Sequence, residues 1–451
     1  MAQVAPARRV AFRILLAVER GHVHADELLR APAVGVLSPA DRNLATTLVL
    51  GVLRWQIRLD HQFRALLRRP SVTIEPEVCV ALRLGAFQLL HLNRIPAHAA
   101  IGESVELVKL SGHRFAAGMV NAVLRKLAAR PVQSWERSVS GLALGWAHPA
   151  WMVERWIHFY GFEAAEAICR HGQKAPDLSL RLASSQVESE LGAAGIALAP
   201  GELLAAARRL VSGDLAAAEA FRAGRARLQD EGSQLVAELA SAGGGTELKS
   251  VLDACAAPGG KTMILAERHP EARIVALEAS ASRREELRKR LAFLSDRVEC
   301  RLGDASAPTP EAAYDLILVD APCSGTGTLG RNPEIRHRLR PEHLNRQSSR
   351  QRAILEAALS AVRPGGNLVY STCSLEPEEN EQVVAAALAA HPQNRLVSLG
   401  ARIEALRKAD ILTSAGAARL ADVLTPEGCL RLLPGKFATD GFFIALIEHS
   451  G

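Results

Sequence analysis

The chain has 451 residues, of which 48% are hydrophobic and 4% aromatic, and it carries a formal net charge of +6. This length exceeds one ordinary domain and predicts two or three, with enough apolar residues for packed cores. The low aromatic content argues against broad base-stacking platforms, so any grip on nucleic acid would depend mainly on charge and shape.

The charge is concentrated in the N-terminal third. Residues 1–130 hold 18 Lys and Arg against 9 Asp and Glu, a balance of +9, and the rest of the chain is slightly acidic. This third is the candidate surface for a polyanion, with a solvated basic surface as the alternative. The candidate phosphate contacts are Arg8, Arg9, Arg13, Arg42, Arg54 and Arg58.

Cysteine usage and hydropathy indicate the compartment. The seven cysteines form no C-x-x-C pair and no metal-ligand spacing. The N-terminus lacks a signal-peptide core, and no apolar run approaches membrane-spanning length. We therefore expect a cytoplasmic protein in a reducing compartment, without a metal and without a membrane association.

Helical spacing of apolar residues runs over 6–130 and predicts an all-α bundle. Ser38 and the Pro-Ala-Asp that follows form a helix-start signal. Further helices are expected over 75–92, 99–111 and 115–129.

Residues 131–240 predict linker helices and a small α/β subdomain that begins with a strand at 179–182. Four of the five tryptophans lie between 135 and 156, which we interpret as a packed hinge rather than an RNA-stacking surface. The segment Gln229-Asp-Glu-Gly-Ser-Gln234 resembles a signature of the enzyme family described below, which implies that it covers a cofactor pocket or positions substrate; a plain helix cap of the Asp-x-x-Gln kind is the alternative.

Residues 241–451 predict a doubly wound sheet with functional residues at the carboxyl ends of its strands. These strand ends are Asp253-Ala-Cys-Ala-Ala-Pro-Gly-Gly-Lys-Thr262, Glu278, Gly303-Asp304, Asp320-Ala-Pro-Cys-Ser-Gly325 and Ser371-Thr-Cys-Ser374. Gly259 and Gly260 can take positive φ, but their spacing fits neither the dinucleotide fingerprint nor the phosphate loop. A nucleoside without phosphates fits better, and Glu278 stands where such folds place the acceptor for ribose hydroxyls.

The rest of this region is less informative. Glu376 to Asn380 open a helix with acidic residues in its first turn. Residues 395–425 predict a helical or loop insertion without an assigned role, and residues 429–433 and 441–447 predict a terminal hairpin that closes the sheet.

Three segments together resemble the RNA cytosine-5 methyltransferases that use S-adenosylmethionine: DACAAPGGKT, DAPCSGTGTLGRNPEIR and YSTCSLEPEEN. Residues 84–125 resemble the RNA-binding domain shared with the antitermination factor NusB. The combination is similar to the RsmB (Sun or Fmu) family. It implies a NusB-like helical bundle at 1–130, linker helices with a small α/β subdomain at 131–240, and a Rossmann-like class I methyltransferase domain at 241–451.

The resemblance also implies cofactor contacts by position. The backbone of Cys255, Ala256, Ala257, Pro258, Gly259, Gly260 and Lys261 would hold the methionine part of S-adenosylmethionine. Glu278 would bind the ribose hydroxyls, Asp304 the adenine amine and Asp320 the sulfonium side, while Arg283 braces the loop. The family usually has Asp at the position of Glu278. Glu278 has one more methylene, so its carboxylate stands farther from the backbone.

Carbon 5 of cytosine is a poor nucleophile, so its methylation requires a thiolate at C6 and later a base that removes the C5 proton. Cys323 and Cys373 can supply both functions, and the residues alone leave open which is the nucleophile. The resemblance to the RNA family implies that Cys373 attacks and Cys323 assists release. Asp320 would hydrogen-bond the cytosine edge, and Lys261 would stabilise the thiolate or anchor the cofactor side.

The resemblance implies methylation of a cytosine in 16S rRNA, of the cytosine-967 type, by a monomer that meets its RNA before or early in subunit assembly. Two alternatives stay open: a cytosine-5 methyltransferase of tRNA, and an RNA-binding or antitermination factor with a vestigial methyltransferase domain. His337 stands where the family commonly has Trp, which puts one packing contact near the target base in doubt.

Overall fold

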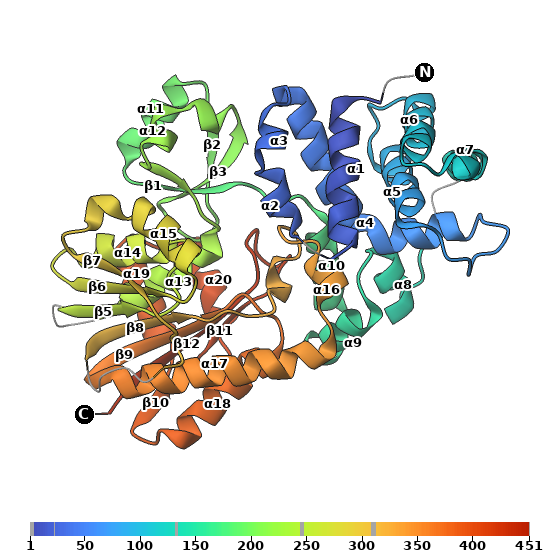
Figure 1. The fold of residues 1–451 in the computed structure, drawn as a ribbon. Coiled ribbons are helices and arrows are strands. Elements are labelled where there is room, and N and C mark those ends of the chain that lie inside the picture. Colours follow the sequence, from blue (N-terminus) through green and yellow to red (C-terminus); the bar gives the residue numbers. More distant parts are fainter. Residues whose placement is uncertain (1–3, 22, 131–133, 244–247, 308–312, 451) are drawn as a thin grey trace. The chain divides into compact units, whose positions relative to one another are not determined.

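The computed structural model describes residues 4–21, 23–130, 134–243, 248–307 and 313–450. Contacts divide the chain into two compact units (Figure 1). The first consists of Met1–Lys174 with Leu329–Arg338, and the second of Ala175–Thr328 with Leu339–Gly451. A short segment from one of the methyltransferase-like motifs therefore belongs to the N-terminal unit.

The first unit is helical, as predicted. Its helices are α1 Pro6–Glu19, α2 Ala25–Leu29, α3 Pro32–Gly35, α4 Pro39–Arg64, α5 Pro76–His91, α6 Ala97–Leu110, η1 Arg114–Ala116, α7 Ala117–Ala128, α8 Val139–Gly145, α9 Ala150–Tyr160, α10 Phe162–Gln173 and α16 Ile335–Arg338. The predicted start signal at Ser38 is confirmed, because its side chain accepts a hydrogen bond from the backbone N–H of Asp41 at 3.1 Å.

Helix α5 forms the centre of this bundle. Its residues from Val78 to Gln88 are all buried, and it packs against α1, α4, α6 and α7. The helices approach closely because a small residue lies at the crossing. A Cβ at Gly51 of α4 would come within 2.0 Å of the Phe87 ring, so only glycine fits there.

Arg336 of α16 connects the segment Leu329–Arg338 to the helices of the first unit by hydrogen bonds. Its Nη1 donates to the carbonyl oxygens of Arg54 and Ala147 at 3.0 and 3.1 Å. Its Nη2 donates to those of Gly172 and Leu329 at 3.1 and 3.3 Å. Burial lowers the pKa of this guanidinium to about 9, so its charge is held by carbonyl dipoles in a desolvated place.

The second unit begins with the predicted small α/β subdomain. Its four-stranded antiparallel sheet has the order β2-β3-β1-β4. The elements are β1 Ser179–Leu182, α11 Ser185–Ala193, β2 Ala197–Pro200, β3 Ala207–Ser212, η2 Leu215–Ala217, α12 Glu219–Arg222 and β4 Ala226–Leu228.

The larger sheet has eight strands in the order β10-β12-β9-β8-β5-β6-β7, with β11 paired to β12. Strands β5 to β9 pair in parallel, and the C-terminal β12 adds antiparallel pairings. The strands are β5 Ser250–Asp253, β6 Arg273–Glu278, β7 Val298–Leu302, β8 Tyr314–Asp320, β9 Val362–Thr372, β10 Asn394–Val397, β11 Leu430–Leu432 and β12 Phe442–His449. The strand order reverses between β5 and β8, which is where doubly wound sheets bind ligands.

Helices cover both faces of this sheet (Figure 1). They are α13 Glu231–Ser241, α14 Gly260–Arg268, α15 Ala281–Arg290, α17 Pro341–Ala361, α18 Glu381–Ala390, α19 Gly400–Lys408 and α20 Ser414–Ala421, with short turns η3 Ala292–Leu294, η4 Thr326–Thr328 and η5 Pro377–Glu379. The predicted terminal hairpin is confirmed as β11 and β12. The stretch 395–425 holds α19 and α20 as expected, but strand β10 was not predicted.

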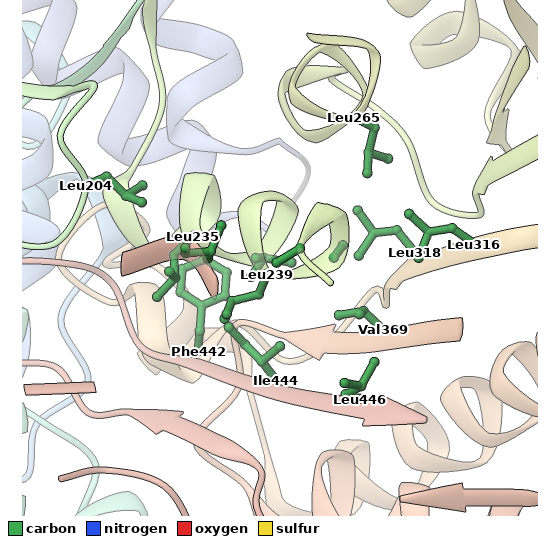
Figure 2. Close-up of a cluster of buried hydrophobic side chains, with 14 of the residues drawn as sticks. Leu204, Leu235, Leu239, Leu265, Leu316, Leu318, Val369, Phe442, Ile444 and Leu446 are labelled. Atoms are coloured by element: carbon green, nitrogen blue, oxygen red, sulfur yellow. The ribbon is translucent and has the colours of Figure 1, made fainter. Parts of the chain in front are cut away.

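Apolar side chains fill both faces of the sheet because its central strands are apolar nearly throughout. Figure 2 shows one of these cores, in which Leu239 of α13 lies near Ile444 of β12 and Leu265 of α14 lies near Leu318 of β8. A second core contains Ile354 and Leu355 of α17. Within the described ranges, no helix combines the length and apolar character needed to cross a membrane.

We predict that Arg336→Ala selectively destabilises the first unit. Removing this side chain takes a donor from four buried carbonyl oxygens, of which that of Arg54 keeps a second side-chain donor, Gln173, and this costs about 2–4 kcal/mol of unfolding free energy. All five tryptophans lie in the first unit, at positions 55, 135, 146, 151 and 156, so denaturation followed by tryptophan fluorescence reports on it.

The control variant is Arg20→Ala, which removes a half-exposed ion pair with Glu77 and should cost less than about 1 kcal/mol. Equal losses for the two variants would contradict the anchoring role of Arg336.

Candidate active site

The loop between β5 and α14 is shaped by Gly259, which has φ of +99°. This confirms the predicted positive φ, whereas Gly260 is helical and begins α14. A Cβ at Gly259 would also lie 2.8 Å from the Cδ1 of Leu287. The loop can therefore keep this shape only with glycine at position 259.

Asp253 ties the end of β5 to the start of α14. The Oγ1 of Thr262 donates to its Oδ2 at 2.7 Å, and the carboxyl group is completely buried. Burial raises the pKa of Asp253 to about 6. This bond fixes the glycine loop between the two residues.

A cavity of about 250 Å³ lies at the carboxyl ends of the parallel strands. It brings together eight residues that the sequence singled out: Cys255, Ala257, Glu278, Arg283, Asp304, Asp320, Cys323 and Cys373. Ala256, Pro258, Gly259, Gly260 and Lys261 do not line it. Arg350 and Ile354 of α17 line it as well. Neither was predicted, because both lie far in the sequence from the motifs at the strand ends.

Two of the lining carboxylates are held by short local contacts. Glu278 is buried, its Oε1 accepts from the N–H of Ser280 at 2.9 Å, and its Oε2 lies 3.6 Å from the guanidinium of Arg283. Arg283 also donates to the carbonyl of Ala257 at 2.9 Å, which fits the predicted bracing role. Hydrogen bonds from the backbone and side chain of Ser306 lower the pKa of Asp304.

Asp320 bridges the glycine loop and strand β9. Its Oδ2 accepts from the Nζ of Lys261 at 2.7 Å, and its Oδ1 accepts from the Oγ of Ser371 at 2.8 Å. Burial acts to lower the pKa of Lys261, but Asp320 outweighs it and raises that pKa above its ordinary value. Lys261 is therefore an ammonium group that also donates to Ser233 at 2.9 Å.

Ser233 belongs to the segment from Gln229 to Gln234, for which the sequence allowed either a role at the cofactor pocket or a plain helix cap. Asp230 caps α13 by accepting from the N–H of Gly232 at 2.9 Å, so the predicted helix cap is confirmed, whereas Gln234 donates to the carbonyl of Gln229 and forms no pair of the Asp-x-x-Gln kind. The contact from Ser233 to Lys261 connects the same segment to the site.

The two candidate catalytic cysteines face each other, with their Sγ atoms 3.3 Å apart. Both are free thiols. The hydrogen bond with Cys373 and burial raise the pKa of Cys323 well above its ordinary value. Cys323 therefore keeps its proton at neutral pH.

Glu379 holds the loops that carry both cysteines. It is completely buried and accepts from the N–H of Ser324 at 2.8 Å, from the Oγ atoms of Ser324 and Ser374, and from the Nε2 of Gln351 at 2.9 Å. The two serines directly follow the two cysteines in the chain. The sequence analysis interpreted this glutamate only as a helix-start residue, because its burial depends on segments remote in the sequence.

Three of the six arginines that were predicted to contact RNA phosphates are buried or half-buried in the first unit. Arg8 is buried and bonds Gln88 and Glu103, and Arg54 is buried and donates to the carbonyl of Gly330. Arg58 is half-buried, donating to the carbonyl of Gly145 and packing on Trp55 and Trp135. These three guanidinium groups are engaged within the protein. The exposed ones are Arg9, Arg13 and Arg42.

His337 lies in the first unit. Its Nε2 is 2.8 Å from the carbonyl oxygen of Leu53, and burial lowers its pKa to about 4. Among the residues that the structure describes, no group of three or more His, Cys, Asp and Glu is arranged to hold a metal.

Three family models match the chain. The model of the 16S rRNA methyltransferases RsmB/F matches residues 245–448, the NusB family residues 5–129, and the RsmF/B-like ferredoxin-like domain residues 148–213.

Whole-chain relatives agree with these matches. "Probable ribosomal RNA small subunit methyltransferase B" of Bacillus subtilis (strain 168) is 33% identical and aligns 98% of this chain with 99% of its own. "Ribosomal RNA small subunit methyltransferase B" of Xanthomonas campestris pv. campestris is also 33% identical, over 98% of this chain and 96% of its own.

Among solved structures, the crystal structure of PH0851 is similar over 99% of both chains, with a TM-score of 0.78 and 25% identity. The structure of NSun6 from Pyrococcus horikoshii with SFG shares the fold over 67% of this chain and 98% of its own, at a TM-score of 0.53 and 18% identity.

We predict that Gly259→Ala weakens cofactor binding. The added methyl group meets Leu287 and forces a strained φ, at a cost of about 1–2 kcal/mol that moves the loop, so S-adenosylmethionine affinity should fall roughly tenfold by calorimetry. Gly365→Ala is the matched control, since Gly365 has φ of +74° but nothing within 4 Å of an added Cβ. Equal affinities for the two variants would contradict a role of this loop in binding.

We predict that Glu379→Ala slows methyl transfer while cofactor affinity stays within twofold. Without the buried acceptor the two cysteine loops lose their common anchor, and a displacement of about 1 Å can cost about 100-fold in rate. Single-turnover rates and calorimetry separate the two quantities. Glu356→Ala, which removes an ion pair with Arg352 on the surface of α17, is the control and should leave both unchanged.

Proposed function

The chain belongs to the RsmB/F family of 16S rRNA methyltransferases, and from this premise we propose that it methylates carbon 5 of a cytosine in 16S rRNA, of the cytosine-967 type. The observation that carries the proposal is the pair of thiols 3.3 Å apart beside a cavity lined by three carboxylates. A methyl transfer to oxygen or nitrogen needs no such pair, whereas carbon 5 of cytosine needs a covalent nucleophile and then a release group.

The cofactor is S-adenosylmethionine, and the residues of the cavity fit it. Glu278 and Asp304 offer acceptor oxygens for ribose hydroxyls and an adenine amine, and Asp320 offers negative charge to the sulfonium side. The positive φ of Gly259 sets the shape of the loop whose residues Cys255 and Ala257 line the cavity, where the methionine part would lie. When bound, the cofactor supplies the methyl group.

Cys373 is the nucleophile in this proposal. Its sulfur forms a bond to C6 of the cytosine, and the electron pair of the C5–C6 double bond moves toward C5 and the ring edge. Asp320 hydrogen-bonds that edge, and its ion pair with Lys261 keeps a proton close to N3. The thiol of Cys323, 3.3 Å away, donates to Cys373 and stabilises its thiolate before attack.

Cys323 changes role once Cys373 is bonded to C6. The hydrogen bond and charge of Cys373 contribute to the raised pKa of Cys323, and both are lost when that sulfur becomes a thioether. The pKa of Cys323 then falls, although burial still raises it, so Cys323 first gives its own proton to water at the cavity mouth and the resulting thiolate takes the C5 proton. The electron pair of the C5–H bond restores the C5–C6 double bond, and Cys373 leaves as a thiolate.

The RNA substrate is best met before or early in subunit assembly, because the target base must be unstacked to reach the cavity and a base in a stem costs more to expose. The proposal takes the protein to act as a monomer. A related enzyme on tRNA uses the same chemistry and differs only in substrate, whereas a vestigial domain has no need of the paired thiols.

We predict that labelled methyl groups pass from S-adenosylmethionine to naked 16S rRNA, and less to assembled small subunits and bulk tRNA. Cys373→Ala should abolish transfer because the nucleophile is lost. Cys323→Ala should accumulate covalent protein–RNA complex, visible on a denaturing gel, because release is blocked. Cys300→Ala, outside the cavity, is the control and should retain full activity.

Stronger labelling of tRNA than of 16S rRNA would assign the chain to tRNA. Reversed phenotypes of the two cysteine variants would exchange their roles, and no label in any RNA together with no cofactor binding would favour the RNA-binding factor.

A further inference from the structure

One face of helix α17 carries arginines toward the mouth of the cavity. Arg346, Arg350 and Ile354 follow one another at intervals of four residues, so they lie along one side of the helix. Ile354 and Arg350 line the cavity together with Cys323 and Cys373. Arg346 lies one turn farther toward the start of the helix.

The position of this helix is fixed by Gln351. Its Nε2 donates to the carbonyl of Pro322 and to the Oε1 of Glu379, both at 2.9 Å. These two contacts join α17 to the loop of one catalytic cysteine and to the glutamate that anchors both. Arg350, the preceding residue, is therefore held at the cavity by the same network that positions the thiols.

The two arginines are exposed, and in the described part of the chain neither has a hydrogen bond or an ion pair. The other cation at the cavity differs, because Arg283 is engaged by Ala257 and Glu278. On the opposite side of α17, Arg352 pairs with Glu356 at 2.7 Å. Arg346 and Arg350 thus present unpaired guanidinium groups at the entrance, where a polyanion can approach.

Resting on the proposed function, we propose that Arg350 and Arg346 bind the RNA phosphates next to the target cytidine, so that the methyltransferase domain itself grips the substrate backbone. A cytosine that enters the cavity leaves its own sugar and phosphates at the mouth. Guanidinium groups one helical turn apart match a backbone that carries a phosphate on every nucleotide, and their planar donors suit phosphate oxygens.

The carboxylate of the cofactor's methionine part is the competing anion for Arg350. It is a single group, and Arg346, which does not line the cavity, would not engage it. If RNA phosphates are the occupants, both arginines affect RNA binding. If the cofactor carboxylate is the occupant, only Arg350 matters, and it affects S-adenosylmethionine binding.

The test compares Arg350→Ala, Arg346→Ala, the double variant and Arg352→Ala, each in the full chain. The RNA probe is a fluorescent fragment of 16S rRNA titrated at several NaCl concentrations, and S-adenosylmethionine binding is measured by calorimetry. Each single variant should weaken RNA binding severalfold and reduce the slope of log affinity against log salt by about one, with cofactor affinity unchanged. Arg352→Ala should match the unmodified protein, and Arg350→Lys should restore the salt slope.

Unchanged RNA affinity and salt slope in the double variant would overturn the proposal, as would loss of S-adenosylmethionine affinity in Arg350→Ala. Methylation of 16S rRNA by the unmodified protein is measured in parallel. If that methylation fails while the arginine variants still lose RNA affinity, the proposed reaction is wrong and the RNA contact stands. Normal methylation with unaffected RNA binding refutes the RNA contact alone.

Discussion

The buried carboxylate of Glu379 is the contact on which the active site depends. It accepts hydrogen bonds from Ser324 and Ser374, which follow the two cysteines of the cavity, and from Gln351 of α17, so three segments distant in the sequence meet on one side chain. A carboxyl group is costly to bury unless its oxygens accept hydrogen bonds. Those of Glu379 accept four, from the N–H and Oγ of Ser324, the Oγ of Ser374 and the Nε2 of Gln351. The chain thereby sets two thiols 3.3 Å apart without a disulfide between them.

The cofactor side is built differently, from the geometry of a parallel sheet. Strands β5, β6, β7 and β8 end at the same edge, so Cys255, Glu278, Asp304 and Asp320 at or just after these ends line one cavity. Asp320 belongs to both halves, because its two oxygens join Lys261 of the glycine loop to Ser371 of β9. In the proposed function this carboxylate faces both the cofactor and the target base.

Much of this was predictable from the sequence because it is local. The strand ends, the left-handed Gly259 and the cap at Ser38 each depend on a few neighbouring residues. The burial of Glu379 and the membership of residues 329–338 in the first unit were not predictable, since both depend on segments far apart in the chain. Net charge likewise identified a basic region but could not tell that Arg8 and Arg54 turn inward.

The most direct test of the two-thiol account uses 16S rRNA fragments in which the target cytidine is replaced by 5-fluorocytidine. Fluorine cannot leave C5 as a proton does, so the protein stays bonded to C6 after methyl transfer. Digestion and tandem mass spectrometry then identify the modified residue. The account predicts a nucleotide adduct on Cys373 and none on Cys323. An adduct on Cys323, or methylated RNA without any adduct, would contradict it.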